Sequence, residues 1–188
     1  NVLKETFEFV RGNVTSTLSL RKIVGRLEEQ GMNVSTTTIE NYLNYWISAY
    51  AIEKLKKFDY KLRRVFSRTA KYYVVDNSLI TGNHEADEKR LENLVYNELI
   101  RKYGRENVFF GQEENGYEVD FIVNDSGKFL CFQVCLRLTN ENSKREFGNL
   151  ELANKHLGCY GVVLFLDNNL NSSLRDLPAR PLIEWLLK

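Results

Sequence analysis

The sequence has few cysteines and histidines and no phosphate-binding loop, and each absence excludes a kind of chemistry. The three cysteines, Cys131, Cys135 and Cys159, show no CxxC spacing, and His84 and His156 stand alone in the sequence. This pattern argues against a zinc or redox site and favours small, buried thiols. No GxxxxGK[ST] segment occurs either. ATP hydrolysis therefore cannot reside in this chain.

Long apolar runs, internal repeats and low-complexity linkers are also missing. Because no segment could span a bilayer, the N-terminus is unlike a signal peptide and cysteines are few, we expect a reducing, cytoplasmic setting. The 188 residues are 43% hydrophobic and 12% aromatic, which suffices for one large or two small packed domains. We place a boundary near Ser78–Glu88 and predict domains at residues 1–80 and 81–188.

Three helices are predicted in the first domain. Val2–Arg11 forms the first helix, and Leu18–Gly31 forms the second, with apolar residues at helical spacing and Gly31 past its end. Ser35 is placed to cap the third helix. A helix, a turn and a capped helix are typical of a helix-turn-helix. The segments IEKLKKFDY and KYYVVD then predict two strands around a basic loop, KLRRVFSRTA, as in a wing.

The predicted wing is strongly basic. Only one acid, Asp59, stands against eight basic residues: Lys54, Lys56, Lys57, Lys61, Arg63, Arg64, Arg68 and Lys71. Such clustering favours contacts with nucleic-acid phosphates. At the start of the third helix, Thr36, Thr37 and Asn41 offer short hydrogen-bonding side chains that suit the major groove of DNA. The alternative is a protein partner or a neighbouring domain, because a basic wing also fits an acidic surface.

In the second domain, the stretch GYEVDFIVNDSGKFLCFQVCLR predicts a hairpin whose turn is NDSG. Alternation in the first strand places Glu118, Asp120 and Ile122 on one face. In the partner strand, Cys131, Gln133, Cys135 and Arg137 share a face. The other faces carry Val119, Phe121, Val123, Phe132, Val134, Leu136 and Leu138. We therefore expect one face to be core and the other to hold a row of polar groups.

That row has the layout of a metal-dependent nuclease of the PD-(D/E)xK type, in which an acid is followed on the next strand by an acid-x-lysine. Clustered carboxylates suit Mg²⁺, and a lysine would stabilise charge on the reacting phosphate. Asp120 occupies the first position, but Gln133 replaces the second acid and Cys135 replaces the lysine. The predicted catalytic site is therefore degenerate.

A helix is predicted from Glu85 to Gly104, ahead of this hairpin. Its buried stripe comprises Leu91, Leu94, Val95 and Leu99, with Glu98 inside the stripe and Glu92 at its flank. An acid on an apolar face is costly unless it is paired, protonated or bound to a cation. Both acids are therefore candidates for a site.

The order of the winged-helix segment, KYYVVD, LENLVYNEL, EVDFIV, QVC and a later KRE resembles the C-terminal region of prokaryotic AAA-type ATPases. The resemblance runs from about Leu20 to Leu187. In that group a P-loop module precedes a winged helix and a PD-(D/E)xK-like domain of uncharacterised function. The resemblance implies that ATP binds an N-terminal module outside this chain, which begins at Asn1 and is expected to be a C-terminal fragment. It also implies that Glu92, with Asp120, corresponds to the metal ligands, and that Glu98 is the second choice.

Three functions remain open for this mixed α/β chain. The first is a noncatalytic module that binds DNA or a partner. The second is an active Mg²⁺-dependent endonuclease, with Glu118 as a substitute ligand or with Lys128 or Arg137 as a relocated basic group. The third is an interdomain regulatory or oligomerisation element of the ATPase. No cofactor is expected here unless the nuclease-like site is active and holds Mg²⁺.

The remaining segments complete the predicted α/β domain. NENSKREFGNLELANKHLG predicts a helix over the sheet, on which Arg145 and Glu146 are expected to form a surface pair. CYGVVLFLD predicts a buried strand that is apolar on both faces. After Pro181, a short apolar segment with Trp185 is expected to dock on the domain.

Overall fold

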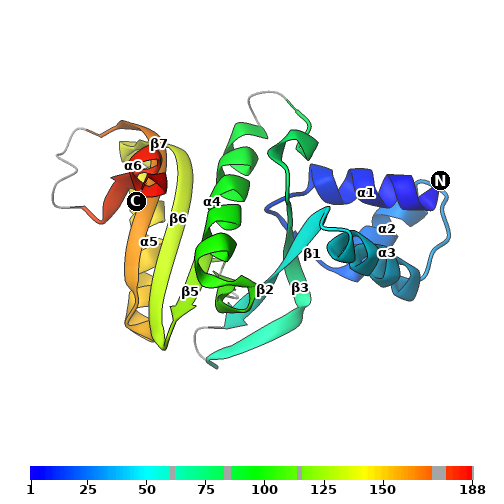
Figure 1. Cartoon of the computed structure of the whole chain (residues 1–188), viewed down its shortest axis with the longest axis horizontal. Helices are drawn as coiled ribbons and strands as arrows, with labels where there is room; N and C mark the ends of the chain where they lie inside the picture. Colours follow the sequence, from blue (N-terminus) through cyan, green and yellow to red (C-terminus); the bar gives the residue numbers. More distant parts are fainter. Residues whose placement is uncertain (60–61, 83–85, 114–115, 171–176, 188) are drawn as a thin grey trace. The chain divides into compact units, whose positions relative to one another are not determined.

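The computed structural model is mixed α/β, as predicted, and describes residues 1–59, 62–82, 86–113, 116–170 and 177–187 (Figure 1). The chain divides into two units, each made of two segments. The first unit comprises Asn1–Lys56 and Phe66–Asn93, and the second comprises Lys57–Val65 and Leu94–Lys188. The boundary expected near residue 80 thus falls within the second segment of the first unit.

The first unit is built from three helices and three strands. In chain order these are α1 (Val2–Gly12), β1 (Thr17–Leu18), α2 (Leu20–Glu29), α3 (Thr36–Ser48), β2 (Ile52–Asp59) and β3 (Arg64–Val74), followed by a short 3-10 helix, η1 (Asn77–Leu79). The strand order is β1-β3-β2, and β1 is antiparallel to β3. The predicted cap of α3 is confirmed, since the Ser35 hydroxyl accepts a hydrogen bond from the Thr38 N–H at 3.1 Å.

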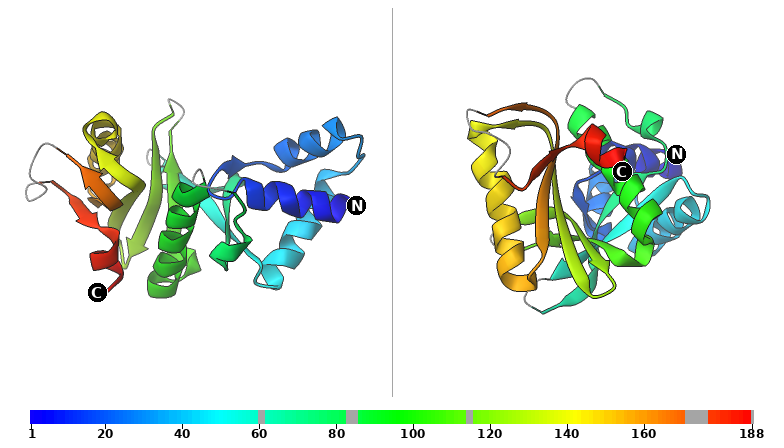
Figure 2. Two further views of the ribbon diagram at one scale, coloured as in Figure 1. Left: turned by 90° about the horizontal axis from the view of Figure 1, so that it is seen from above. Right: turned by 60° about the vertical axis from the view of Figure 1, so that its left-hand side comes forward.

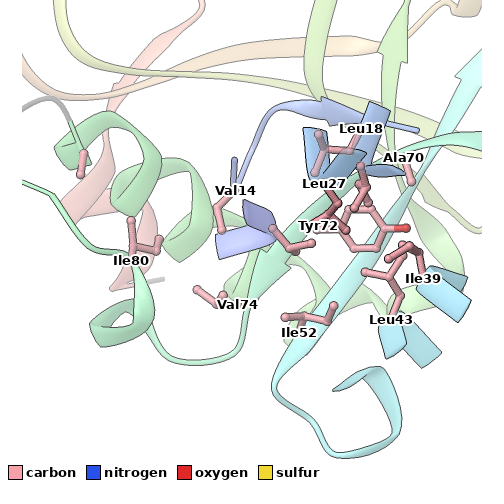
Figure 3. Close-up of a cluster of buried hydrophobic side chains, with 13 residues drawn as sticks. Val14, Leu18, Leu27, Ile39, Leu43, Ile52, Ala70, Tyr72, Val74 and Ile80 are labelled. Carbon is pink, nitrogen blue, oxygen red and sulfur yellow. The ribbon is translucent and has the colours of Figure 1, made fainter. Parts of the chain in front are cut away.

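Apolar side chains from all three helices and three strands form the core of this unit (Figure 3). Its fully buried members include Val10, Leu18, Ile23, Leu27, Ile39, Ile52 and Val74. The predicted helical periodicity of the second helix therefore marks its core face correctly, because Ile23 and Leu27 are both buried there.

The predicted basic loop is wrong in its extent. β3 begins at Arg64, so most of KLRRVFSRTA is strand and not loop. Its Val65 and Phe66 are β-branched and aromatic residues that favour an extended backbone. Lys71 is also not available to a phosphate, because its side chain is 2% exposed. Lys61 lies outside the described residues, and so does the side chain of Arg68.

The second unit contains an open sheet with helices against it. After α4 (Asp87–Tyr103), which the two units share, come η3 (Arg105–Asn107), β4 (Val108–Gln112), β5 (Glu118–Asp125), β6 (Lys128–Thr139), α5 (Asn140–Leu157), β7 (Tyr160–Asn169), β8 (Ala179–Pro181) and α6 (Leu182–Leu186). The last residues of β2, Lys57–Asp59, belong to this unit too, and its strand order is β2-β4-β5-β6-β7-β8. β4, β5 and β6 are antiparallel, whereas β6, β7 and β8 are parallel. The crossover from β6 to β7 is α5, which packs along both strands (Figure 2).

The predicted hairpin is confirmed, but its predicted polar face is wrong. Asp125 pairs with Lys128 across a two-residue turn, Ser126–Gly127, in which both residues have positive φ. β5 carries a bulge, because Phe109 faces Ile122 while Gly111 faces Val119, which leaves one extra residue in β5. The alternation therefore breaks, and Val119 and Ile122 share one core.

That core includes the supposed polar face of β6. Cys131 and Cys135 pack with Leu150, Ala153 and Leu157 of α5. α5 therefore covers this face of the sheet, and the two cysteines belong to its core. Of the predicted row of polar groups, Asp120, Cys131, Gln133 and Cys135 are thus buried, whereas Arg137 is exposed.

The stripe predicted on α4 is partly wrong. Leu91, Val95 and Leu99 are buried, but Leu94 is 39% exposed and Tyr96 is buried in its place. Tyr96 packs on Phe121 of β5 with ring centroids 6.2 Å apart. The helix therefore buries a face that is rotated from the predicted one.

The C-terminal prediction is confirmed. Trp185 of α6 docks edge-on against Phe132 of β6, with ring centroids 5.8 Å apart. β7 is buried from Val162 to Phe165, as its apolar sequence predicts. Within the described residues, no helix combines the length and apolar character needed to cross a membrane.

Candidate functional site

The surface of α3 is the clearest candidate for a binding site in the first unit. Buried Ile39 and Leu43 anchor one side of the helix. The exposed positions follow the helical repeat and are Thr36, Thr37, Glu40, Asn41, Asn44, Tyr45 and Ser48. Glu40 is the single charged residue among these seven. The three predicted contact residues, Thr36, Thr37 and Asn41, thus share one exposed face with further hydrogen-bonding groups.

The basic residues predicted for the wing are divided between the two units. Lys56 is exposed in the first unit, whereas Lys57, Arg63 and Arg64 belong to the second. Within the second unit, Phe58 is buried between Phe109 and Phe129, at ring-centroid distances of 5.8 and 5.6 Å. The Arg63 guanidinium donates a hydrogen bond to the backbone oxygen of His156 at 3.3 Å. The segment is therefore packed and not a free loop, although Arg63 and Arg64 stay exposed.

Asp120, Gln133 and Cys135 are all buried in the second unit, with exposed fractions of 6 to 7%. Asp120 lies in the bulge of β5, where the Val134 N–H donates a hydrogen bond to its carboxylate at 2.8 Å. The carboxylate thus satisfies a backbone donor on the neighbouring strand. The side-chain oxygen of Gln133 is buried and accepts no hydrogen bond in the described part of the chain.

Glu92 has two donors within the first unit. Lys71 Nζ lies 3.2 Å and the Tyr73 hydroxyl 2.7 Å from the same carboxylate oxygen. Lys71 and Tyr73 are fully buried, and the Glu92 side chain is 16% exposed. The acid is therefore paired with a buried cation, which offsets the cost of placing a carboxylate beside an apolar stripe.

The substitute residues also have partners. Glu98 is not inside the buried stripe but is paired with Arg101, whose hydrogen bond lowers the pKa of the Glu98 carboxyl. Glu118 accepts a hydrogen bond from Gln112 at 3.0 Å. Arg137 forms an exposed ion pair with Asp167 on β7. Lys128 is exposed at the hairpin turn, at the far end of β6 from Arg137.

Glu146 is a buried acid whose importance the sequence does not reveal. It pairs with Arg145 as predicted, but it is 1% exposed, so the expected surface pair is wrong. Its second carboxylate oxygen is buried without a hydrogen-bond partner in the described residues. Its burial could have been predicted from its helical spacing with Leu150, Ala153 and Leu157, which places it on the sheet-facing side of α5.

The donor set does not fit a metal ion. Across the described ranges, no three His, Cys, Asp or Glu side chains come together in a group that could hold one. Gln133 supplies a neutral oxygen where Mg²⁺ would be expected to bind a carboxylate. Cys131 and Cys159 are buried neighbours, and a hydrogen bond between their thiols, with burial, raises the pKa of Cys131. The cysteines therefore behave as core residues.

Comparisons with known proteins identify a family for this chain, but the matches carry no known activity. An uncharacterized protein of Methanocaldococcus jannaschii is 37% identical over 146 residues, which are 74% of this chain and 32% of that protein. An uncharacterized protein of Haemophilus influenzae is 30% identical over 144 residues, which are 73% of this chain and 35% of that protein. The chain thus spans about a third of the length of these curated relatives. No solved structure matches it.

The family match covers the first unit and continues to the end of α4. Residues 1–103 match the family described as a domain of unknown function (DUF8612). Tyr103 is the last residue of α4, so the matched segment ends where a helix ends. Because this segment is more than half of the 188 residues, the chain belongs to the DUF8612 family of domains of unknown function.

Proposed function

We propose that this chain is a noncatalytic DNA-binding module, in which the first unit is a winged helix and the second is a nuclease-like scaffold that does not cut. The observation that carries the proposal is the exposed face of α3, with six uncharged side chains among its seven exposed residues. A solvated helix surface usually carries charged residues. Threonine and asparagine side chains instead suit hydrogen bonds and apolar contacts to base edges in the major groove.

The order of the elements supports the first half of this proposal. In a winged helix, a helix-turn-helix precedes a two-stranded wing, and the order α2, α3, β2, β3 corresponds to that arrangement. The second helix of such a pair enters the major groove. Exposed Lys56, Arg63 and Arg64 would add contacts to phosphates.

The buried positions of the second unit support a scaffold without catalysis. Asp120 is engaged by a backbone N–H, and Gln133 and Cys135 are nearly inaccessible to a phosphate. The relatives are about three times as long as the matched segment, which leaves room for the P-loop module that the ATPase resemblance implies. In that setting the chain would place an ATPase on DNA.

The proposal is tested by titrating a fluorescent DNA duplex with the full chain over a salt series. Asn41→Ala is expected to weaken binding to a preferred sequence by about 1–3 kcal/mol. Asn154→Ala makes the same change at an exposed position of α5 and should have no effect. Neutralising Lys56, Arg63 and Arg64 together should lower the salt slope by about 0.9 for each lost phosphate contact.

Each competing function gives a different result in the same experiment. Equal binding by the Asn41 and Asn154 variants would exclude α3 as the interface. No binding at any salt concentration would favour the interdomain element. DNA cleavage that requires Mn²⁺ and is lost in Asp120→Ala would establish the endonuclease in place of the scaffold.

A further inference from the structure

A pocket of about 590 Å³ lies within the first unit, walled by the start of α2, one side of α3 and strands β2 and β3. Leu18, Leu43, Ile47 and Ala70 supply apolar surface to it. Pockets of this volume accommodate small organic ligands, and they typically combine apolar walls with a few polar groups that orient the ligand.

Tyr72 supplies a hydroxyl group to this pocket. The residue is 4% exposed and lines the pocket. Figure 3 shows its ring among Ile39, Leu43 and Ala70. Burial, together with the charge of Glu40, raises the pKa of Tyr72 to about 12, so the hydroxyl remains a donor at neutral pH. An oxygen of a ligand in the pocket can accept a hydrogen bond from this hydroxyl.

Charged groups of both signs line the same pocket, with positive charge in excess. Arg21 stands in the first turn of α2, Lys54 on β2 and Glu40 on α3. None of the three forms an ion pair within the residues that the structure describes. The amino-terminal end of the α2 dipole, close to Arg21, adds to the positive potential. An anionic group therefore complements this lining better than a cationic or neutral one.

From these observations we infer that the pocket binds a small amphipathic organic anion. Its apolar body would lie against Leu43 and Ile47, its anionic group would lie between Arg21 and Lys54, and an oxygen would accept a hydrogen bond from Tyr72. The pocket shares Thr36 with the proposed DNA-contact face of α3, but binding of the anion does not require DNA. A phosphate of the DNA backbone has no apolar body with which to fill such a pocket.

The test uses 8-anilinonaphthalene-1-sulfonate as probe, with its uncharged parent N-phenyl-1-naphthylamine for comparison, and measures fluorescence on the full chain. We expect one site for the sulfonate and weaker binding of the neutral parent. Tyr72→Phe should weaken sulfonate binding roughly 3- to 10-fold, the range of one hydrogen bond. Lys54→Gln should weaken it by a similar factor, and Glu40→Gln should tighten it because a like charge is removed.

The control is Lys22→Gln, which makes the same charge change as Lys54→Gln on the exposed side of α2. It should leave the affinity for the sulfonate unchanged. Circular dichroism and urea unfolding would establish that each variant is folded. The inference is overturned if the sulfonate does not bind, if Lys22→Gln and Lys54→Gln behave alike, or if Glu40→Gln does not tighten binding.

Discussion

At the scale of single residues, Glu92, one of the two predicted metal ligands, is explained by a buried cation. Lys71 and Tyr73 both donate to one oxygen of its carboxylate, and both are fully buried on β3. A lysine this deeply buried needs a counter-charge, because an ammonium group without one is strongly destabilising. The placement of Glu92 at the flank of an apolar stripe therefore follows from the needs of Lys71, without a metal.

The first prediction concerns this pair. Glu92→Gln should lower the free energy of unfolding by about 2–4 kcal/mol, somewhat less than for a fully buried pair because Glu92 keeps some exposure. Urea denaturation measures the loss. The control is Glu98→Gln, which removes an acid from the same helix whose partner, Arg101, is exposed and needs no buried counter-charge, so stability should change little. Equal stability of the two variants would contradict the structural role.

The raised pKa of Tyr72 predicts that the folded protein loses stability at high pH. Its pKa is raised to about 12 in the folded protein, against about 10 in the unfolded chain. The unfolded state therefore releases the proton first, so the stabilising contribution is complete below pH 10 and is lost as pH rises towards 12. The loss should reach roughly 3 kcal/mol at most, at 1.36 kcal/mol per pKa unit.

Comparison of the chain with Tyr72→Phe isolates this effect from the other tyrosines. Urea unfolding at several pH values from 8 to 11.5 should show a steeper decline for the natural chain than for Tyr72→Phe. Absorbance near 295 nm should show one fewer late-titrating tyrosine in the variant. Parallel stability curves would show that Tyr72 titrates like an exposed residue.

At the scale of helices and strands, the sequence correctly predicts features that depend on neighbouring residues alone. The predicted helix cap at Ser35 and the predicted turn at Ser126–Gly127 are both confirmed, because each depends on residues within one turn. The bulge at Asp120 was missed because it arises only when β5 pairs with β4. The burial of Gln133 and Cys135 was missed because it depends on α5 covering β6, a contact between segments that periodicity in either one does not reveal.

We also predict that the N-cap residue of α3, Ser35, contributes to the stability of the protein. Ser35→Ala removes the acceptor of the Thr38 N–H and should cost about 1 kcal/mol of stability. Ser48→Ala, at the other end of the same helix, serves as the control and should cost nothing, since alanine favours helices. The measurement is chemical denaturation of both variants. A loss in Ser48→Ala as large as in Ser35→Ala would rule out capping as the cause.

At the scale of the whole molecule, the family segment and the compact units do not coincide. The DUF8612 match ends at Tyr103, but Lys57–Val65, within that match, belongs to the second unit. Phe58 packs on Phe109 and Phe129, which both lie beyond the match. The homologous segment therefore contains apolar surface that is covered by residues outside it.

A fragment of residues 1–103 should consequently associate with itself. Without β4, its neighbour in the sheet, β2 has an unpaired edge, and Phe58 loses its aromatic contacts. Unprotected edges promote pairing between chains, and a lysine on the edge prevents it. Size-exclusion chromatography should show larger species for the fragment and a monomer for the fragment carrying Phe58→Lys. A monomeric fragment with Phe58 intact would disprove this expectation.

The hydrogen bond between Asp120 and the Val134 N–H has a consequence for how substitutions accumulate in the second unit. A carboxylate that satisfies a backbone donor at a bulge is maintained by selection for folding, whether or not the protein cleaves a phosphodiester. Under the proposed nuclease-like origin of this unit, a lineage that stops cutting should therefore keep this aspartate long after its catalytic use has ended.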